Sequence, residues 1–220
     1  MWEGIVKESH LLDLSNLQEF SVGMKLGTEF PHWLKDQNEL NNIIFNTTGI
    51  SNVVADWFVK LDLKLDNLDM AYNNLTGKVP KAQISSQLVR VDSSLARGNN
   101  EITVILSVRN NKFLGHISFK VCSLSGLHIL DLSINNLCGS ILSCFGNLEG
   151  FKVELTHNKL TGNIPTSTQF QTKVDPIIFQ GNVALCGPPL SECVGDGTTT
   201  TSQSRRNDEG KTDDEDKLKK

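Results

Sequence analysis

Leu65 to Pro80 reads LDNLDMAYNNLTGKVP, a stretch whose apolar residues follow an unusual spacing. The spacing fits neither a helical stripe with a period of about 3.6 nor a strand with a period of about 2. It fits a template L-x-x-L-x-L-x-x-N-x-L-x-G-x-I-P, in which Met70 and Val79 fill two aliphatic positions. Such a template indicates a repeat unit, so we searched the chain for further copies.

The template recurs along the chain at a nearly constant period. The copy at 127–142 fills every position but the last, and VELTHNKLTGNIP at 153–165 is a second strong match. Weaker copies span 106–118 and 40–54, and in the latter Thr48 stands where Asn is expected. Where consecutive copies are present, their starts lie 23 to 25 residues apart. The sequence therefore predicts a stack of coils.

Each template position has a physical task in such a coil. L-x-x-L-x-L makes a short strand with inward-facing leucines, and the Asn amide turns inward to pair backbone groups at the bend. Gly permits a backbone conformation that other residues avoid, and I-P returns the chain along the outer side. One coil cannot bury enough surface alone, so neighbouring coils must pair their strands into one parallel sheet.

Composition narrows the function classes. The formal charge is −4 and Lys and Arg are scattered, which argues against a nucleic-acid partner. Five cysteines without a C-x-x-C motif favour structural disulfides in an oxidising compartment. The sequence has no apolar run long enough to cross a membrane, and its N-terminus lacks the continuous apolar core of a signal peptide.

The L-x-G-x-I-P ending resembles plant-type leucine-rich repeats. The chain is similar to plant receptor-like proteins, above all to the subgroup that includes receptors for fungal ethylene-inducing xylanase. The stretches that carry the resemblance cover about half of the chain and are FPHWLKDQNEL (30–40), 50–80, 121–148 and LTGNIPTSTQFQTKVDPIIFQGNVALCGPPLSEC (160–193). The resemblance implies an α/β leucine-rich-repeat solenoid of about five to six repeats, some degenerate. It implies a right-handed coil with a parallel sheet on the concave face and a 3-10 or irregular convex side.

Interruptions of the pattern divide the chain. We expect a truncated or irregular repeat in 1–26, because LQEFSV runs straight into GMKLGTEFP, and the solenoid in 27–180. The solenoid contains an irregular stretch at 81–101, where Leu88, Val89 and Val91 are a possible strand, and a second seam at 149–153. We expect the C-terminal cap in 181–193. The polar residues 194–220 cannot bury enough surface to fold, which predicts a disordered charged tail.

The cysteines fall into three groups. By resemblance, the G-N-x-x-L-C-G-x-P-L stretch is the cap, closed by a disulfide between Cys186 and Cys193. Cys122 and Cys144 occupy nearby places on successive coils, just after the I-P position, and are either bridged or two buried free thiols. Cys138 precedes the Gly of its repeat, faces outward and remains the odd thiol.

Candidate binding residues are the variable x positions of the strands, which packing does not fix. They point to one curved surface of mixed polar and aliphatic character, which suits a peptide or protein ligand. The candidates are Asp66, Asn67, Asp69, Tyr72, Ser107, Arg109, His128, Asp131, Ser133, Lys152 and Glu154.

Two sequons, NTT at Asn46 and NLT at Asn74, are candidate glycosylation sites in a secreted protein. Asn74, in the turn after a strand, is the favoured one. The sequence carries no G-x-S-x-G, H-E-x-x-H, phosphate loop or kinase signature, so we expect no enzyme activity, cofactor or metal site. The five histidines are dispersed.

The resemblance implies the ectodomain of a kinase-less receptor at the plasma membrane. Such a receptor recognises a microbial elicitor or endogenous peptide or protein outside the cell and signals in defence through a membrane receptor kinase as co-receptor. A second hypothesis is a secreted inhibitor or decoy of a microbial enzyme, like the leucine-rich inhibitors of fungal polygalacturonases. A third is a decayed gene product without function, which the seams and the absent signal peptide favour.

Overall fold

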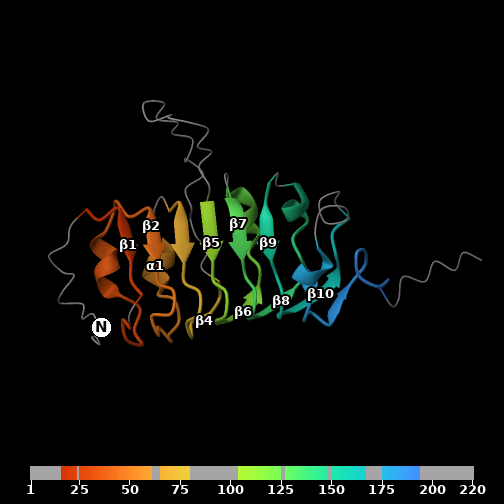
Figure 1. Ribbon diagram of the computed structural model, residues 1–220, viewed down its shortest axis with the longest axis horizontal. Helices are drawn as coiled ribbons and strands as arrows, with labels where there is room; N and C mark the ends of the chain where they lie inside the picture. Colours follow the sequence, from red (N-terminus) through yellow and green to blue (C-terminus); the bar gives the residue numbers. More distant parts are fainter. Residues whose placement is uncertain are drawn as a thin grey trace, which may run out of the picture.

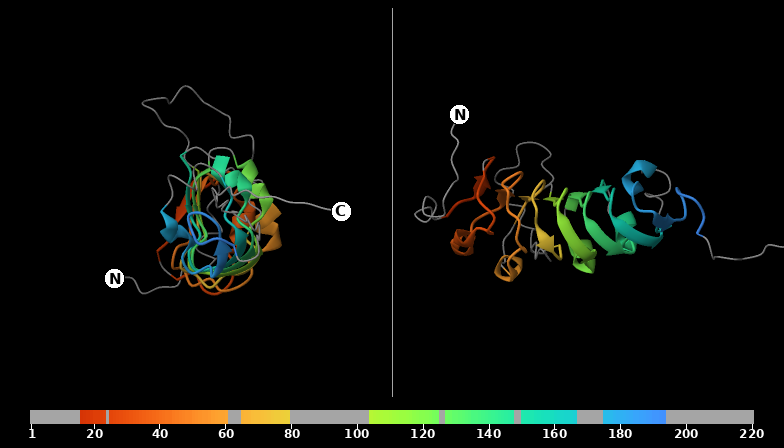
Figure 2. Two further views of the ribbon diagram at one scale, coloured as in Figure 1. Left: turned by 90° about the vertical axis from the view of Figure 1, so that its right-hand side faces the viewer. Right: turned by 90° about the horizontal axis from the view of Figure 1, so that it is seen from below.

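The chain winds into one row of stacked coils. The computed structural model describes residues 16–23, 25–60, 65–79, 104–124, 127–147, 150–166 and 175–193. Figure 1 shows the coils side by side, and the left view of Figure 2 looks along the row, where they superpose. Two parallel sheets and a set of short helical turns form the wall of the coil. The solenoid predicted from the repeats is confirmed.

The larger sheet takes one short strand from each coil. All six strands are parallel, in the order β1-β2-β3-β5-β7-β9. Their second-leucine positions align in register, and the buried residues Ile43, Leu68, Leu106, Leu130 and Val153 form one row. The strands are β1 (Glu19–Ser21), β2 (Asn42–Ile44), β3 (Asn67–Asp69), β5 (Val104–Ser107), β7 (Leu127–Asp131) and β9 (Lys152–Glu154).

A second sheet follows the Asn of each repeat, along the lower edge of Figure 1. Its five parallel strands are ordered β11-β10-β8-β6-β4. This sheet was not expected, because its strands coincide with the x-L-x-G part of the template, which lacks a period-2 run. The strands are β4 (Thr76–Gly77), β6 (Lys112–His116), β8 (Asn136–Gly139), β10 (Lys159–Asn163) and β11 (Ala184–Cys186).

Short helical turns close the remaining side of the coil. Two of them begin at a capping side chain: Ser118 accepts a hydrogen bond from the Lys120 N–H, and Asp175 accepts one from the Ile177 N–H. Their brevity follows from the repeat length, which leaves about one turn between the two sheets. The turns are η2 (His32–Asp36), α1 (Asp56–Lys60), η3 (Phe119–Ser123), η4 (Ser143–Asn147) and η5 (Pro176–Phe179).

The core runs through the centre of the whole row. In the opening stretch all five inward positions are buried: Leu65, Leu68, Met70, Leu75 and Val79. The corresponding side chains of the other coils join them in one continuous cluster that extends from Phe30 to Leu185. No coil has a core of its own, which is the reason that single repeats do not fold alone.

A ladder of buried asparagines joins successive coils. Asn135 is typical, because its Nδ2 donates to the carbonyls of Leu132 in its own coil and Val108 in the preceding coil. Its Oδ1 accepts the Phe113 N–H of the preceding coil at 3.0 Å. The same set of bonds recurs at Asn111, Asn158 and Asn182.

The ladder changes at its N-terminal end. Thr48 is fully buried and its hydroxyl donates to the Phe45 carbonyl at 2.9 Å, so it replaces one bond of the expected Asn. Asn73 restores the ladder, since its Nδ2 donates to the carbonyls of both Phe45 and Met70. Thr48 therefore acts as a shorter rung whose remaining partners are supplied by the next coil.

The residue before each ladder position has a positive φ. Tyr72, Asn110, Ile134 and His157 have φ values between 51° and 55°. Left-handed backbone is costly for a branched side chain such as Ile134, so the ladder must hold it there. In the cap this position is Gly181, where a Cβ atom would approach the His157 backbone to 2.8 Å.

The segment 1–26, where a truncated repeat was expected, supplies β1. Glu19 lies opposite Asn42, so the first strand precedes the second by 23 residues, the length of a repeat. Phe20 and Leu26 pack against the core. This coil departs from the template at Lys25, which the register places level with Thr48.

The solenoid is continuous across both internal seams. β3 pairs directly with β5, and the Asn111 Nδ2 donates to the Met70 carbonyl, although residues 80–103 intervene. Across the seam at 149–153, β7 pairs with β9 and Asn158 donates to Leu132. Residues 80–103, with the possible strand at Leu88, Val89 and Val91, lie outside the described residues, as does the tail 194–220.

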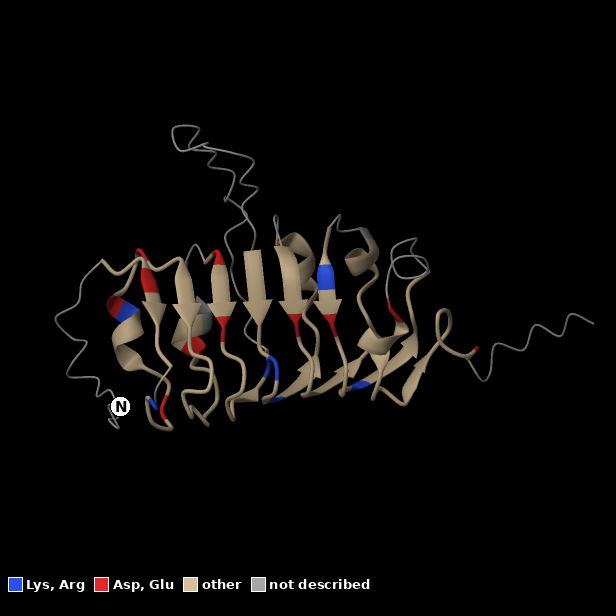
Figure 3. Cartoon of the chain, in the orientation of Figure 1, with Lys and Arg blue, Asp and Glu red and all other residues tan. Residues whose placement is uncertain are grey.

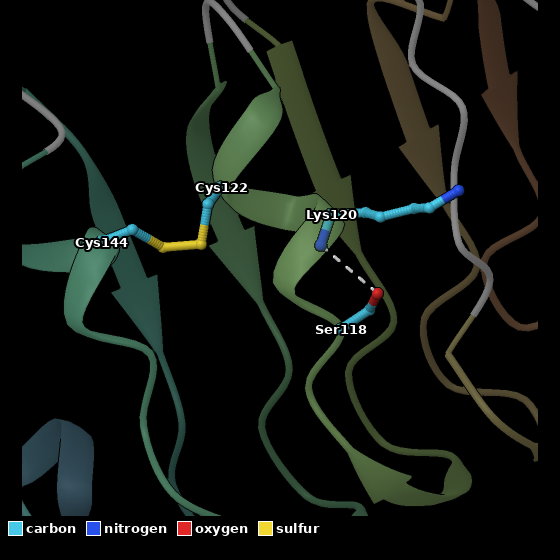
Figure 4. The surroundings of a disulfide bond; sticks show 4 residues. All are labelled: Ser118, Lys120, Cys122 and Cys144. Carbon is cyan, nitrogen blue, oxygen red and sulfur yellow. Dashed lines mark hydrogen bonds between the residues drawn. A yellow bond between two sulfur atoms is a disulfide. The ribbon is translucent and has the colours of Figure 1, made fainter.

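Two disulfides fasten the coils. Cys122 of η3 is joined to Cys144 of η4, so this bond links two adjacent coils on the helical side, as Figure 4 shows. Cys186 of β11 is joined to Cys193 across the last coil. All five cysteines lie within the described ranges, and the half-exposed Cys138 is free.

The ladder predicts a large difference between two neighbouring asparagines. Asn135→Ala leaves buried backbone groups of two coils without partners, and we expect a loss of at least about 2 kcal/mol in the free energy of unfolding. Asn136→Ala is the matched control, because Asn136 is exposed on β8. Urea denaturation measures both, and equal losses would contradict the ladder as the source of stability.

The disulfides predict a second stability series. In the chain-entropy model, Cys122→Ser with Cys144→Ser costs about 3 kcal/mol of unfolding free energy, and Cys186→Ser with Cys193→Ser about 2 to 3 kcal/mol. Cys138→Ser should leave stability unchanged, because its thiol is unbridged. Thermal melts with and without reductant test the series. A wild-type melting temperature that is the same with and without reductant would refute it.

Candidate binding surface on the larger sheet

The outward side of the larger sheet forms the candidate site, called the strand face below. Its residues align in rows because the strands are parallel and in register. One row runs Ile44, Asp69, Ser107, Asp131, Glu154 across β2, β3, β5, β7 and β9. Acidic residues end β3, β7 and β9 in this row, and Figure 3 shows them as red strand tips.

Two of these acids have the same local role. The Asp69 Oδ1 accepts the Ala71 N–H at 2.9 Å, and the Asp131 Oδ1 accepts the Ser133 N–H at 3.0 Å. Each carboxylate thereby satisfies a backbone donor where its strand ends. The second Asp69 oxygen accepts a bond from the Asn46 amide at 3.3 Å, so the side chains of adjacent coils are linked on this face.

A cluster of side chains from three coils surrounds Arg109. The Arg109 Nη1 lies 3.7 Å from an Asp131 carboxylate oxygen and donates to the Ser133 hydroxyl at 3.2 Å. The Ser133 hydroxyl in turn donates to the Asp131 Oδ1 at 2.5 Å. The guanidinium carbon lies 5.8 Å from the centre of the Tyr72 ring, a cation–π distance. The guanidinium is therefore oriented before any ligand arrives.

Glu154 lies beside this cluster with its charge poorly compensated. Burial raises the pKa of the Glu154 carboxyl, and the neighbouring Asp131 raises it further, whereas Arg109 lowers it and Asp175 adds a smaller increase. Asp131 and Glu154 are opposite each other on adjacent strands. At the start of β3, burial also raises the pKa of Asp66.

Three oxygens near the start of β2 and β3 have no hydrogen-bond donor among the described residues. They are the Oδ1 atoms of Asn42, Asp66 and Asn67, all shielded from solvent. The Arg109 Nε is likewise buried and without an acceptor there. Oxygens without donors thus predominate at this end of the face, a condition that usually carries an energetic cost.

The structure brings some of the sequence candidates together and separates others. Tyr72, Arg109, Asp131 and Ser133 form one cluster, and Glu154 adjoins it. Asp66 and Asn67 lie at the start of β3, and Lys152 at the start of β9. His128 lies at a shift in the register between β5 and β7, so Ile129 takes its place opposite Ile105.

The two sequons differ in exposure. Asn74 is exposed in the turn before β4, whereas Asn46 is half buried and its amide is bonded to Asp69 on the strand face. Sequence reasoning also missed two roles: Asn182 was assigned only to the cap motif but is the last rung of the ladder, and Asn46 links to Asp69. The equal Asn offset was the available signal for Asn182.

The strand face offers hydrogen bonds, charge and one exposed aromatic ring to a ligand. Among the residues that the structure describes, no three His, Cys, Asp or Glu side chains gather in a way that would hold a metal ion. Within the same ranges, no helix has the length and apolar character needed to span a bilayer.

Comparison with known proteins places this architecture in a family. The family model described as Leucine Rich Repeat matches residues 126–148. Receptor-like protein 32 of Arabidopsis thaliana is 34% identical over 142 residues, covering 64% of this chain and 15% of the relative. Receptor-like protein EIX2 of Solanum lycopersicum is 34% identical over 190 residues, covering 74% of this chain and 17% of the relative. This chain belongs to the family of plant leucine-rich-repeat receptor-like proteins.

The receptor-like chain spans only a small part of these relatives' length. A further relative, Polygalacturonase inhibitor 1 of Arabidopsis thaliana, is 33% identical over 113 residues, which cover 51% of this chain and 34% of the inhibitor.

Solved structures share the fold of this receptor-like chain. The BIR2 ectodomain from Arabidopsis thaliana superposes with a TM-score of 0.57 at 27% identity, covering 72% of this chain and 75% of that one. The Arabidopsis receptor kinase HAESA, in complex with the peptide hormone IDA and the co-receptor SERK1, has a TM-score of 0.57 at 26% identity. That match covers 79% of this chain and 25% of the other.

The charge arrangement beside Arg109 predicts opposite responses of one carboxyl. Asp131→Asn should lower the pKa of Glu154, because it removes a neighbouring negative charge, and Arg109→Met should raise it, because it removes a positive one. Carbon-detected NMR titration of labelled glutamate carboxyls measures both. If neither substitution moves the Glu154 titration, the two charges are too well screened to act on it.

Proposed function

We propose that the chain is the ligand-recognition region of an extracellular receptor-like protein whose strand face binds a peptide or protein. The carrying observation is the cluster around Arg109, whose side chains are held in one arrangement by neighbours from three coils. Packing of the core does not require these groups on the outer side of the sheet. Groups ordered in advance lose less conformational entropy on binding, which favours recognition.

The proposed role is binding without catalysis, in defence signalling through a partner receptor kinase in the membrane. The complex of HAESA with a peptide hormone and a co-receptor supports a ligand and a kinase partner, because that ectodomain shares this fold. The resemblance to receptors for microbial xylanase supports a microbial elicitor as ligand, and an endogenous signal would use the same face.

We place this function on the extracellular side of the plasma membrane. Two disulfides support the placement, because such bonds persist in oxidising compartments. The exposed Asn74 is the proposed glycan site. A glycan on Asn46 would occupy the strand face, and its attachment would compete with the bond to Asp69.

A second candidate is a secreted inhibitor of a microbial enzyme. The relative named Polygalacturonase inhibitor 1 favours it, since it is 33% identical over about half of this chain. The two candidates differ in one assay. An inhibitor would lower the activity of purified fungal polygalacturonase in solution, whereas a receptor ectodomain would leave that activity unchanged.

A steric block on the strand face tests the proposed function. Ser107 lies between Asp69 and Asp131, so Ser107→Trp covers the centre of the face. Thr161→Trp is the matched control, because Thr161 is exposed on β10 of the second sheet. The full chain, secreted from plant cells, is used to select random dodecapeptides displayed on phage.

We expect peptides that bind the wild-type chain and Thr161→Trp but not Ser107→Trp. Melting temperatures of the variants show whether each is folded as the wild type is. Equal selection by both tryptophan variants would place binding elsewhere, and no enrichment on the folded wild-type chain would refute peptide recognition by this face.

A further inference from the structure

The strand face carries more negative than positive charge. Among the described residues in or directly after its strands, the cations are Arg109, which follows β5, and Lys152, and Arg109 is already paired with Asp131. The carboxylates on or beside the face are Glu19, Asp66, Asp69, Asp131 and Glu154. A ligand that meets this face therefore encounters a field that favours cations.

Three of the carboxylates lie in one line. Asp69, Asp131 and Glu154 occupy the same register row, with Ser107 between the first two. Adjacent strands are about 4.8 Å apart, so the row extends over roughly 14 Å from Asp69 to Glu154. Like charges opposite each other on neighbouring strands destabilise a sheet. The backbone bonds of Asp69 and Asp131 account for those two acids, but they do not account for the placement of Glu154 opposite Asp131.

In the described part of the same face, hydrogen-bond acceptors without donors also outnumber donors without acceptors. The Oδ1 atoms of Asn42, Asp66 and Asn67 lack donors among the described residues. Asn42 and Asn67 are register partners, so these acceptors are neighbours on β2 and β3. Because these oxygens are shielded from solvent, they contribute negative potential at this end of the face rather than direct contacts to a ligand.

Apolar contact is available beside the acidic row. Tyr72 is 44% exposed and Ile134 is 37% exposed, and both occupy the position before the ladder asparagine. The positive backbone angle fixes the direction in which each side chain leaves the sheet edge. An aromatic or aliphatic ligand side chain could pack there while charged neighbours reach the acidic row.

We infer that the partner of the strand face is an extended polypeptide segment with lysine or arginine at alternating positions and an apolar side chain for Tyr72. Side chains on one side of an extended chain repeat about every 6.8 Å, so residues i and i+4 lie about 14 Å apart. That separation matches the span from Asp69 to Glu154. The inference rests on the proposed function and adds the chemistry of the ligand.

The state of Glu154 agrees with this ligand. Burial and the nearby Asp131 both raise the pKa of its carboxyl, so the ionised form is incompletely stabilised in the free protein. A ligand cation placed beside Glu154 would supply the missing compensation. Asp131 keeps its bonds to Ser133 in the process, because its Oδ1 is already engaged by that residue.

The selection on the full chain distinguishes this inference from the proposed function. We expect the peptides that Ser107→Trp fails to bind to carry lysine or arginine at alternate positions, with aromatic or aliphatic residues among them. Enriched peptides that are neutral or acidic would overturn the inference and leave peptide binding intact. An absence of enriched peptides would overturn the proposed function itself.

Defined probes give a quantitative test. A synthetic peptide with lysine at alternate positions is compared by calorimetry with versions that carry glutamine or glutamate there. The double variant Asp131→Asn with Glu154→Gln should bind the lysine peptide with about 3- to 30-fold lower affinity, because two partly exposed charge pairs are lost. Asparagine retains an Oδ1 acceptor for the Ser133 N–H, so the fold is kept.

Glu39→Gln is the matched control, because Glu39 is exposed between η2 and β2 and is not part of the acidic row. It should bind the lysine peptide as the wild type does, and added salt should weaken that binding. Equal affinity of the wild type for the lysine and glutamine peptides would overturn the inference, and so would an unchanged affinity in the folded double variant.

Discussion

Every coil of this protein has to pair the backbone groups that its bend leaves without strand partners. The inward asparagine does so in two directions, since its amide donates within its own coil and to the coil before it. Asn135, for example, bonds to Leu132, Val108 and Phe113. A buried polar group without a hydrogen-bond partner costs about 1 to 3 kcal/mol, so the loss of one ladder asparagine would destabilise two coils. Strand register, core alignment and the left-handed residue before each rung depend on this bond set.

The same constraint accounts for the tolerance of the solenoid to irregular chain length. Asn73 and Asn111 bond to a common carbonyl, that of Met70, although the chain between them is longer than a normal repeat. What a coil must preserve is the spacing from strand to rung, because these residues meet the preceding coil. The length of the chain between a coil's strand in the second sheet and the next strand of the larger sheet can vary, because the entropy cost of loop closure rises little with each added residue.

The sequence was informative where a position has one physical task. Leucine, asparagine and glycine offsets predicted the coil, its buried residues and the direction of the strands. The second sheet was not predicted, because its strands are too short to show an alternating pattern. The pairing of β3 with β5 was not predicted either, because a local sequence pattern does not show which strands pair when a longer segment separates them. The predicted binding residues remain a prediction, and Ser133 departs from the expected outward orientation because its side chain is fully buried. The Arg109 cluster joins three coils, and no offset encodes such contacts.

In-register stacking also explains why the strand face has a chemical character of its own. Parallel coils place equivalent positions beside one another, so an acid at the end of one strand meets whatever ends the next. Asp131 and Glu154 are neighbours for this reason, and a fold selected only for stability would favour opposite charges there. Leucine and asparagine fix the coil, which leaves the outward row free to carry like charges on adjacent strands, as at Asp131 and Glu154. The regularity that makes the solenoid stable therefore also lets each strand end contribute its own side chain to the proposed binding face.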